Sequence, residues 1–288
     1  MDPITELLTS WKFPVGQWGK QFFEFLTTYF EGFFDAISRG ITGFLDALIA
    51  GLLWLPPPVT VLLIAALAYL LKKSWALSIG VAAGLIFIIN QDLWKETMET
   101  LALVVGATTV SMAIGVPLGI AAGHRDWLYR FLQPLLDLMQ TLPTFVYLIP
   151  ALVLFGLGMA PGLIATVIFA IPAPIRLTYL GITSVPKQLI EAGEAFGATR
   201  RQLLWKIELP AALPTIMAGF TQCIMLSLSM VVIAALVGAN GLGKPVVRAL
   251  NSVNVPLGLE AGLAIVVLAI ILDRVCRVEA VAPQEKAK

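Results

Sequence analysis

The sequence predicts an all-α integral membrane protein with about seven transmembrane helices, preceded by an N-terminal amphipathic segment. Three observations lead to this fold class. Hydrophobic residues make up 58% of the 288 residues and charged residues only 13%, whereas soluble domains carry about 25% charged residues. The mean hydropathy is +0.89. Long apolar stretches recur along the chain, and because backbone polar groups in the lipid core must pair internally, we expect these stretches to be helices.

A membrane span needs roughly 20 mostly apolar residues, and seven stretches approach or exceed that length. They are Leu52–Leu71, Trp75–Asn90, Met98–Gly123, Leu135–Met159, Gly162–Ile182, Leu213–Val237 and Pro256–Val275. The second is short, and we expect it to tilt little or to end in the interface. The chain thus divides into a leader (1–51), a transmembrane domain (52–278) and a polar tail (279–288) that we expect to be disordered.

Lysine and arginine residues near the span ends predict the orientation, because cytoplasmic loops carry an excess of them. With seven spans, the four basic clusters that follow the first, third, fifth and seventh spans fall on one side. They contain Lys72 and Lys73; His124, Arg125 and Arg130; Lys187, Arg200, Arg201 and Lys206; and Arg274, Arg277, Lys286 and Lys288. We assign that side to the cytoplasm, which places the N-terminus outside and the C-terminus inside. An even number of spans would scatter these clusters.

The leader has an amphipathic helical pattern from Trp18 to Ile49. Its apolar residues are interrupted by charges at Lys20, Glu24, Glu31, Asp35, Arg39 and Asp46. This pattern favours one or two helices lying in the outer membrane interface. The alternative is an extra transmembrane span, which the repeated acidic residues make costly. Early Asp2 and Glu6, without an apolar core and a small-residue cleavage site, argue against a signal peptide.

The sequence lacks the residue patterns of an enzyme or a metal site. Cys223 and Cys276 lie in or beside apolar segments without a CxxC spacing, which predicts inert thiols. His124 is the only histidine and cannot form a metal cluster alone. There is no GxxxxGK[ST] phosphate loop, and a net charge of +1 gives no argument for nucleic acid. We expect a non-catalytic protein that binds no cofactor of its own.

The strongest functional signal is the segment 187–210, KQLIEAGEAFGATRRQLLWKIELP, on the predicted cytoplasmic side. Pro186 precedes it, which suits a helix start, and Pro210 ends it. Gly197 interrupts the helical pattern and allows a sharp bend that a residue with a Cβ would resist. The expected product is a short helix–turn–helix with an apolar ridge edged by charges, a surface suited to docking in a partner's groove. A plain amphipathic loop is the alternative interpretation.

This segment resembles a cytoplasmic loop in the membrane subunits of binding-protein-dependent ABC importers. The family pattern is Glu-Ala-Ala, three residues, Gly, nine residues, Ile, one residue and Leu-Pro. The matching positions are Glu191, Ala192, Gly197, Ile207, Leu209 and Pro210, with Gly193 where the second alanine is usual. Glycine keeps close approach possible and slightly weakens the helix. In that family the loop forms the coupling helix that docks into the ATPase subunit, so the resemblance puts Glu191, Gly197, Arg200 and Arg201 at or near that contact.

The resemblance extends over roughly 52–278, to type I importer permeases of the glycine betaine and proline betaine branch. The stretches TLPTFVYLIPALVLFG, IFAIPAPIRLTYLGI and LVGANGLGKPV carry it, and the Phe-rich leader fits in character. It implies a homodimer in the bacterial cytoplasmic (inner) membrane, bound to two ATP-binding cassette subunits that hold ATP and Mg²⁺. It also implies an extracytoplasmic substrate-binding protein, and import of a quaternary-ammonium compatible solute such as glycine betaine, proline betaine or choline for osmoprotection.

Small polar, flexible or charged residues in the predicted spans are candidates for the translocation pathway. They are Thr144 and Tyr147 in the fourth span, Arg176 in the fifth, and Thr221, Met225, Ser227, Ser229 and Met230 in the sixth. Hydroxyls suit a weakly polar path for a compact zwitterion, although they more often bond to their own helix backbone. An intramembrane charge is a functional candidate by default, but snorkelling to the interface is the simpler account of Arg176.

Three other interpretations remain open. A related ABC permease for another small solute, such as methionine, is separated from the betaine branch only by the family resemblance. An ion-coupled secondary transporter needs intramembrane acidic residues and inverted repeats. A membrane-embedded enzyme needs clustered Asp, Glu, His or Cys at depth. The sequence has neither of the last two patterns.

Overall fold

The computed structural model describes residues 13–277, and every regular element in this range is helical, which confirms the predicted all-α class. The tail (279–288) lies outside the described residues. The elements are α2 (Val15–Leu53), α3 (Pro57–Lys72), α4 (Trp75–Asn90), α5 (Trp94–Gly123), α6 (Asp126–Thr141), α7 (Thr144–Phe155), α8 (Met159–Ala170), α9 (Pro172–Thr183), α10 (Lys187–Ala195), α11 (Arg200–Leu203), the π-helical turn η1 (Leu204–Glu208), α12 (Leu209–Ala235), α13 (Gly243–Ser252) and α14 (Val255–Cys276).

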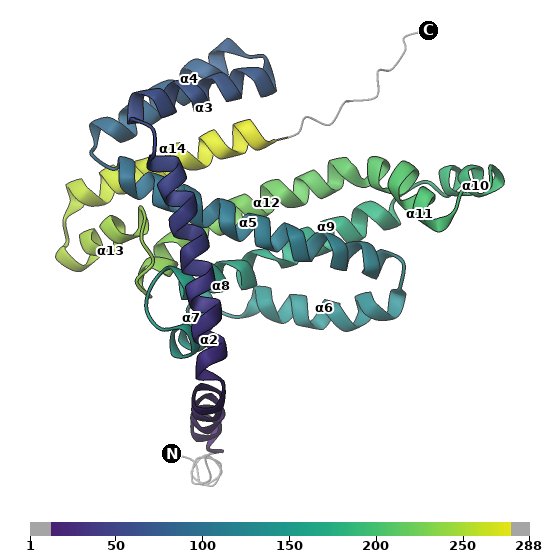
Figure 1. Ribbon diagram of the computed structural model, residues 1–288, viewed down its shortest axis with the longest axis horizontal. Coiled ribbons are helices and arrows are strands. Elements are labelled where there is room, and N and C mark those ends of the chain that lie inside the picture. Colours follow the sequence, from purple (N-terminus) through teal and green to yellow (C-terminus); the bar gives the residue numbers. More distant parts are fainter. Residues whose placement is uncertain (1–12, 278–288) are drawn as a thin grey trace, which may run out of the picture.

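The centre of the molecule is a bundle in which α5, α9 and α12 run side by side (Figure 1). Glycines on α5 allow its close packing on α9. A Cβ added at Gly119 would lie 2.6 Å from the Cβ of Thr178 and 2.7 Å from the carbonyl oxygen of Ile175. Small residues at such contacts let membrane helices approach backbone to backbone. We call the end of the bundle that carries α10 and α11 the inner end, and the opposite end, with α13, the outer end (Figure 1).

Within residues 13–277, five segments are long and apolar enough to cross a membrane: α2, α5, α8 with α9, α11 through α12, and α14. α6 and α7 would make a sixth, but they are bent by 98° at the break between them. The predicted span at Leu135–Met159 is therefore bent sharply, since it begins inside α6 and continues through α7. Leu142 is extended, with φ −65° and ψ 135°, because the ring of Pro143 disfavours helical geometry in the residue before it.

α3 and α4 are apolar helices of 16 residues each, shorter than the other candidate spans. They form a hairpin that turns at Lys73, which has a φ of +49°. The hairpin packs on α14, where a Cβ added to Gly84 would lie 2.7 Å from Cγ1 of Val267. Its buried residues join the largest apolar cluster of the described chain, so the hairpin is attached to the side of the bundle through α14.

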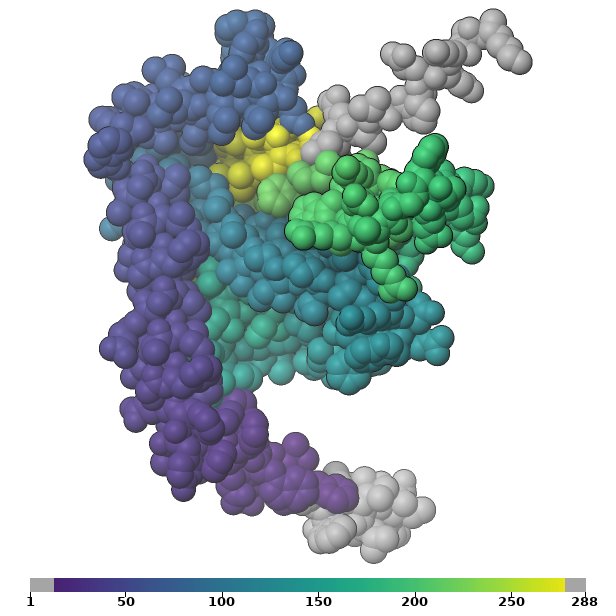
Figure 2. All heavy atoms as spheres, turned by 45° about the vertical axis from the view of Figure 1, so that its right-hand side comes forward, coloured from purple at the N-terminus to yellow at the C-terminus, as the bar shows by residue number. Residues whose placement is uncertain are grey.

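The leader folds as the single helix α2 of 39 residues, with a non-helical residue at Phe30. Its length and hydropathy are those of a membrane span, as in the alternative interpretation. However, most of α2 is exposed, and Leu45 is its one buried residue. It crosses the bundle instead of running alongside α5 and α12 (Figure 1), and its first half projects beyond the body (Figure 2). Leu45 anchors it in the core. Location in the outer interface stays a prediction.

Candidate functional site

The segment predicted to couple to a partner folds as a helix–turn–helix at the inner end, as its sequence indicated. α10 ends at Ala195, and the chain reverses at Gly197, which has a φ of +77°. The amide of Gly197 donates to the carbonyl oxygen of Glu194 at 2.8 Å, and the amide of Ala198 donates to that of Gly193 at 3.0 Å. A left-handed residue after a helix is the common way to pair its last carbonyls, and glycine adopts it without strain. Gly197 thus sets the bend between the two arms.

Gly193 is the point where the two arms of this segment meet. It is buried, and a Cβ added there would lie 2.5 Å from Cδ1 of Ile207 and 2.6 Å from Cδ2 of Leu203. The departure from the family's usual alanine is therefore matched by two bulky side chains packed against the glycine. The contacts of Gly193 with Leu203 and Ile207 thus pack α10 against the second arm.

The second arm begins with a capping box that the sequence analysis did not recognise. The backbone amide of Thr199 donates to Oε1 of Gln202 at 2.8 Å, and the amide of Gln202 donates to the Thr199 hydroxyl at 3.4 Å. A Ser or Thr followed three residues later by Glu or Gln is the sequence signature of this motif. The cap fixes where α11 starts and therefore how Arg200 and Arg201 are presented.

The arm continues through η1, whose last residue, Glu208, is buried. The carboxylate Oε2 of Glu208 lies 2.8 Å from Nε2 of His124, at the inner end of α5. Neither residue was a predicted site residue. The available signal was weak: the only histidine of the chain lies in one basic cluster, and the acidic residue lies beside the Leu-Pro of the loop pattern. Their contact ties the coupling segment to the bundle.

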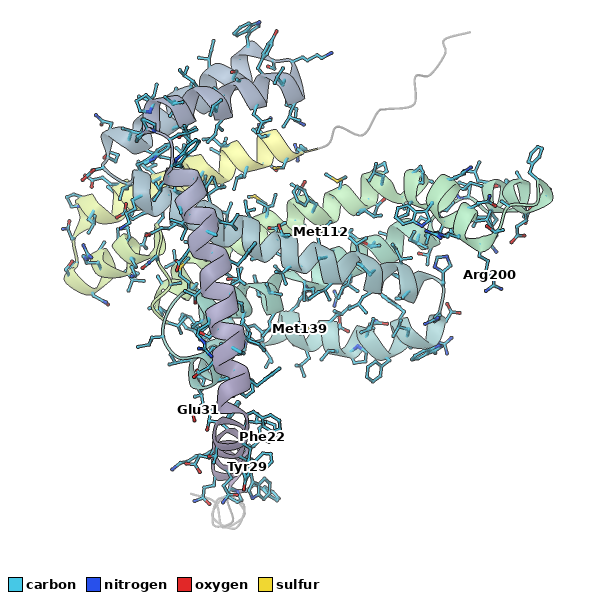
Figure 3. All side chains as sticks on the ribbon, viewed as in Figure 1. Phe22, Tyr29, Glu31, Met112, Met139 and Arg200 are labelled. Carbon is cyan, nitrogen blue, oxygen red and sulfur yellow. The ribbon has the colours of Figure 1, made fainter. Side chains whose placement is uncertain are left out.

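Large apolar side chains are exposed on the outside of the segment. Phe196 is 93% exposed, Trp205 64% and Leu189 47%. α10 and α11 project from the inner end of the bundle (Figure 1), and Arg200 points away from it (Figure 3). Exposed aromatic residues surrounded by charges are typical of the anchors of protein interfaces. We call this surface, made by Leu189, Phe196, Arg200, Arg201 and Trp205, the docking ridge.

The predicted coupling residues divide into exposed and packed positions. Glu191, Ala192, Gly197, Arg200, Arg201 and Pro210 are exposed, Ile207 and Leu209 are half-buried, and Gly193 is buried. The exposed set can contact a partner, whereas the packed set holds the arms together. Phe196 and Trp205, the most exposed aromatic residues of the segment, were not among the predicted site residues. The available signal was that each is a large apolar residue next to a position expected at the surface, Gly197 at the bend and Lys206.

The predicted pathway residues do not lie on one surface. Met225 and Ser229 are exposed, and Thr144 and Thr221 are half-buried. Tyr147, Ser227 and Met230 are buried within this chain, and the Tyr147 hydroxyl donates to the carbonyl oxygen of Met139. The Ser227 hydroxyl has no hydrogen-bond partner among the described residues. The exposed and buried members of the set thus face different surroundings.

Arg176 forms an ion pair with Asp137, and its snorkelling to the interface stays a prediction. Its Nη2 lies 2.5 Å from Oδ1 of Asp137 on α6, and the two side chains are 34% and 54% exposed. Along the same seam, the rings of Tyr129 on α6 and Tyr179 on α9 stack at 3.5 Å. The pair lies about 10 Å from the inner end of α9, by the rise of a helix. A partly exposed ion pair at that depth is expected to face water or protein, because lipid would disfavour it.

Polar surfaces also follow α6 and α12. On α6, Gln133, Asp137 and Gln140 are exposed at helical spacing. On α12, a hollow of about 310 Å³ is lined by Pro214, Met217, Ala218, Thr221, Gln222, Met225, Asp273 and Arg277. Two predicted pathway residues, Thr221 and Met225, meet there. Asp273 and Arg277 come from the inner end of α14 and were not among the predicted pathway residues.

The described residues form a bundle of apolar helices with polar surfaces along α6 and α12 and a projecting loop that exposes aromatic residues, features that fit a membrane protein with a docking surface. Residues 115–278 match the family described as binding-protein-dependent transport system inner membrane component. The chain belongs to this family, and it is therefore a multi-pass membrane permease component. The resemblance drawn from the loop pattern is confirmed.

Relatives and solved structures agree with this assignment. The chain is 45% identical over 259 residues to the glycine betaine transport system permease protein OpuAB of Bacillus subtilis, covering 88% of this chain and 90% of the relative. It is 42% identical over 274 residues to the glycine betaine/proline betaine transport system permease protein ProW of Escherichia coli, covering 95% and 76%. A structure of the inward-facing MetNI methionine ABC transporter matches with a TM-score of 0.58 at 24% identity, covering 64% of this chain and 94% of that chain, which shows the fold alone.

Proposed function

We propose that this chain is the permease subunit of an ATP-driven importer of a quaternary-ammonium compatible solute, such as glycine betaine, proline betaine or choline. The observation that carries the proposal is identity of 42–45% over most of the chain to permeases whose names state glycine betaine transport. The methionine alternative has only a fold-level similarity at 24% identity in its favour. The ion-coupled transporter and the membrane enzyme are disfavoured by the family.

The working assembly contains two copies of this chain, two ATP-binding cassette subunits and an extracytoplasmic binding protein. ATP and Mg²⁺ are bound and ATP is hydrolysed in the cassette subunits. The docking ridge supports this, since Phe196 is 93% exposed and no other described residue covers it. A bacterial inner membrane with the N-terminus outside and the C-terminus inside agrees with the basic residues near the inner end. No nucleic acid takes part.

Transport proceeds by alternating access, driven through the coupling loop. When the cassette subunits close, they displace the docking ridge, and the arms held by Gly193 and Glu208 carry that movement to α5 and α12. The solute passes between two copies of the chain, along the polar surfaces of α6 and α12. The Arg176–Asp137 pair suits a betaine, which carries a cationic quaternary ammonium and a carboxylate, because it offers one group of each opposite charge.

The test is reconstitution of the chain with its cassette subunits and binding protein in proteoliposomes. We expect uptake of glycine betaine that needs ATP and is not inhibited by excess methionine. The double substitution Arg200→Glu with Arg201→Glu should abolish uptake while the chain still inserts into the membrane. Uptake by the chain without cassette subunits, or uptake of methionine in place of betaine, would refute the proposed function.

A further inference from the structure

An apolar groove lies between α4 and α14, on the side of α14 turned away from the α12 hollow. Its volume is about 480 Å³, and it is lined by Ala76, Leu77, Gly80, Val81, Gly84, Val267, Ile270, Ile271 and Arg274. Gly84 brings the two helices together at the outer end of the groove. Gly80 leaves its middle open, because nothing lies within 4 Å of a Cβ built at that position.

The inner end of the groove is positively charged. Arg274, exposed in the last turn of α14, is the only charged residue in the lining. Lys73, exposed at the turn between α3 and α4, adds positive charge at the same end of the hairpin. The rings of Tyr69 and Trp75 pack there at 4.4 Å, and aromatic residues of this kind mark the level of the membrane interface. The groove thus runs from the interface into the apolar layer.

From these features we infer that the α4–α14 groove binds an anionic phospholipid, with an acyl chain along Gly80 and the phosphate at Arg274. The chemistry of the groove matches such a lipid at both ends: an apolar slot for a chain and a cation for the headgroup. Basic pockets between membrane helices on the cytoplasmic side are a recognised form of headgroup site. The bound lipid would attach the α3–α4 hairpin to α14 and complete a contact that the protein leaves open.

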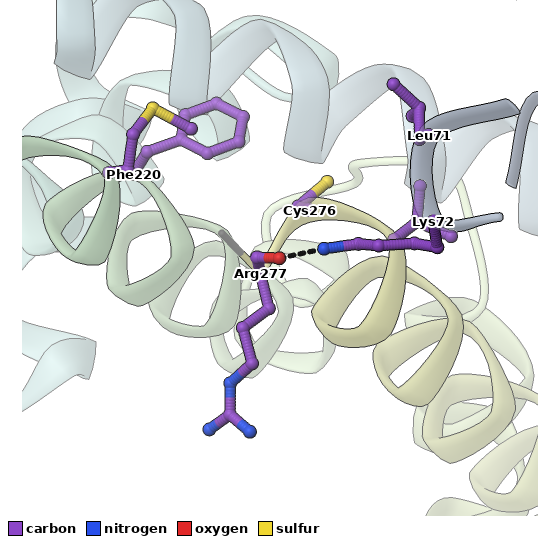
Figure 4. Close-up of a pocket in the computed structure, with 7 residues that line it drawn as sticks. Leu71, Lys72, Phe220, Cys276 and Arg277 are labelled. Atoms are coloured by element: carbon purple, nitrogen blue, oxygen red, sulfur yellow. Dashed lines mark hydrogen bonds between the residues drawn. The ribbon is translucent and has the colours of Figure 1, made fainter. Parts of the chain in front are cut away.

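A second hollow, of about 530 Å³, flanks the other side of α14 and is lined by Leu71, Lys72, Met217, Phe220, Val275, Cys276 and Arg277. It is less suited to a headgroup. The Lys72 ammonium donates to the carbonyl oxygen of Arg277, and the Arg277 guanidinium points away from the other labelled residues (Figure 4). We therefore assign the lipid to the α4–α14 groove.

The experiment is native mass spectrometry of the purified full chain titrated with phosphatidylglycerol or phosphatidylcholine of the same acyl chains. We expect the wild type to prefer one phosphatidylglycerol by about fivefold, the effect of one well-placed cation. Arg274→Gln should remove the preference, and Gly80→Leu, which fills the open slot, should weaken both lipids. The matched controls are Arg248→Gln on α13 and Gly262→Leu on α14, where a Cβ also meets nothing within 4 Å.

Phosphatidylglycerol binding that is unchanged in both Arg274→Gln and Gly80→Leu would overturn the inference. Displacement of the lipid by equimolar inorganic phosphate would also overturn it, since the acyl chain would then contribute nothing. So would crosslinking of the groove to a second copy of the chain. These outcomes are independent of solute uptake, so the lipid site and the proposed function can fail separately. If Gly80→Leu does not fold, Arg274→Gln decides the question alone.

Discussion

Nε2 of His124 lies 2.8 Å from Oε2 of Glu208, which joins the inner end of α5 to the second arm of the coupling loop. The other ring nitrogen of His124 lies 2.9 Å from the carbonyl oxygen of Ile120. The imidazole of His124 is thus held between the backbone of α5 and the carboxylate of Glu208. The contact connects η1 directly to α5.

We expect His124→Ala and Glu208→Ala each to reduce solute-stimulated ATP hydrolysis in the reconstituted transporter. Two residues that act through one contact are non-additive, with an interaction of about 1 kcal/mol. The double variant should therefore be little worse than Glu208→Ala alone. The measurement is a double-mutant cycle on the rate of solute-stimulated ATP hydrolysis. Fully additive losses would show that the two side chains act separately.

Gly193 gives a prediction that separates size from conformation. Gly193→Ala should be tolerated, because the added Cβ meets only the mobile ends of Leu203 and Ile207, and alanine gains about 1 kcal/mol of helix propensity. Gly193→Leu should force the two arms apart and uncouple hydrolysis from uptake. Both variants should insert normally, which surface labelling of intact vesicles would check. Equal activity of the leucine and alanine variants would contradict a packed joint at this position.

Phe196 is expected to be an anchor of the contact with the cassette subunit. Phe196→Ser should weaken the affinity for purified cassette subunit by about thirtyfold, the loss of roughly 2 kcal/mol typical of a buried aromatic anchor. It should leave the stability of the isolated chain unchanged, because the side chain is 93% exposed there. Val253→Ser, at an 83% exposed residue of the outer end, is the matched control. An unaltered affinity for Phe196→Ser would place the docking contact elsewhere.

Gly197→Pro should uncouple the transporter, because proline holds φ near −65° and this position has a φ of +77°. Gly197→Ala keeps the amide and should have a smaller effect, about 1 kcal/mol of backbone strain. Solute-independent ATP hydrolysis with reduced uptake is the expected signature of the proline variant. If the proline variant coupled as well as the alanine variant, the bend at Gly197 would not matter for coupling.

Local features of the fold could be predicted from the sequence because their causes are local. Helices followed from the length of apolar runs, and the bend of the coupling loop followed from Gly197, a glycine that can adopt a left-handed conformation without strain. The break between α6 and α7 was not predicted, although Pro143 is there in the sequence. The apolar run continues on both sides of the break, so hydropathy does not indicate a change of helix direction. The sequence also did not decide whether the leader forms one helix or two, because its apolar pattern continues past the non-helical Phe30.

The contacts that complete the candidate site could not be predicted, because their partners are distant in sequence. His124 and Glu208 are 84 residues apart, and Asp137 and Arg176 are 39 apart. Periodicity places each of these residues on a helix but does not say which helices are neighbours. Whether a side chain is exposed also depends on which helices are neighbours. Met225 and Met230 were equivalent candidates in the sequence, yet Met230 is fully buried and Met225 is not.

The Asp137–Arg176 pair provides the sharpest test of the pathway. If the pair meets the solute, Arg176→Gln should lower uptake of glycine betaine, which has a carboxylate, more than uptake of choline, which has none. Asp137→Asn should lower both, because both solutes carry a quaternary ammonium. The pair is partly exposed, so we expect about a fivefold change in each case, at the upper end for exposed ion pairs. Glycine betaine and choline should compete for uptake in one assay, with the same binding protein for variant and wild type. The solute preference of the binding protein then affects both permeases equally and cancels in the comparison. A betaine-to-choline ratio that stays the same in Arg176→Gln, with uptake lowered equally for both solutes, would mean that the pair only fastens α6 to α9.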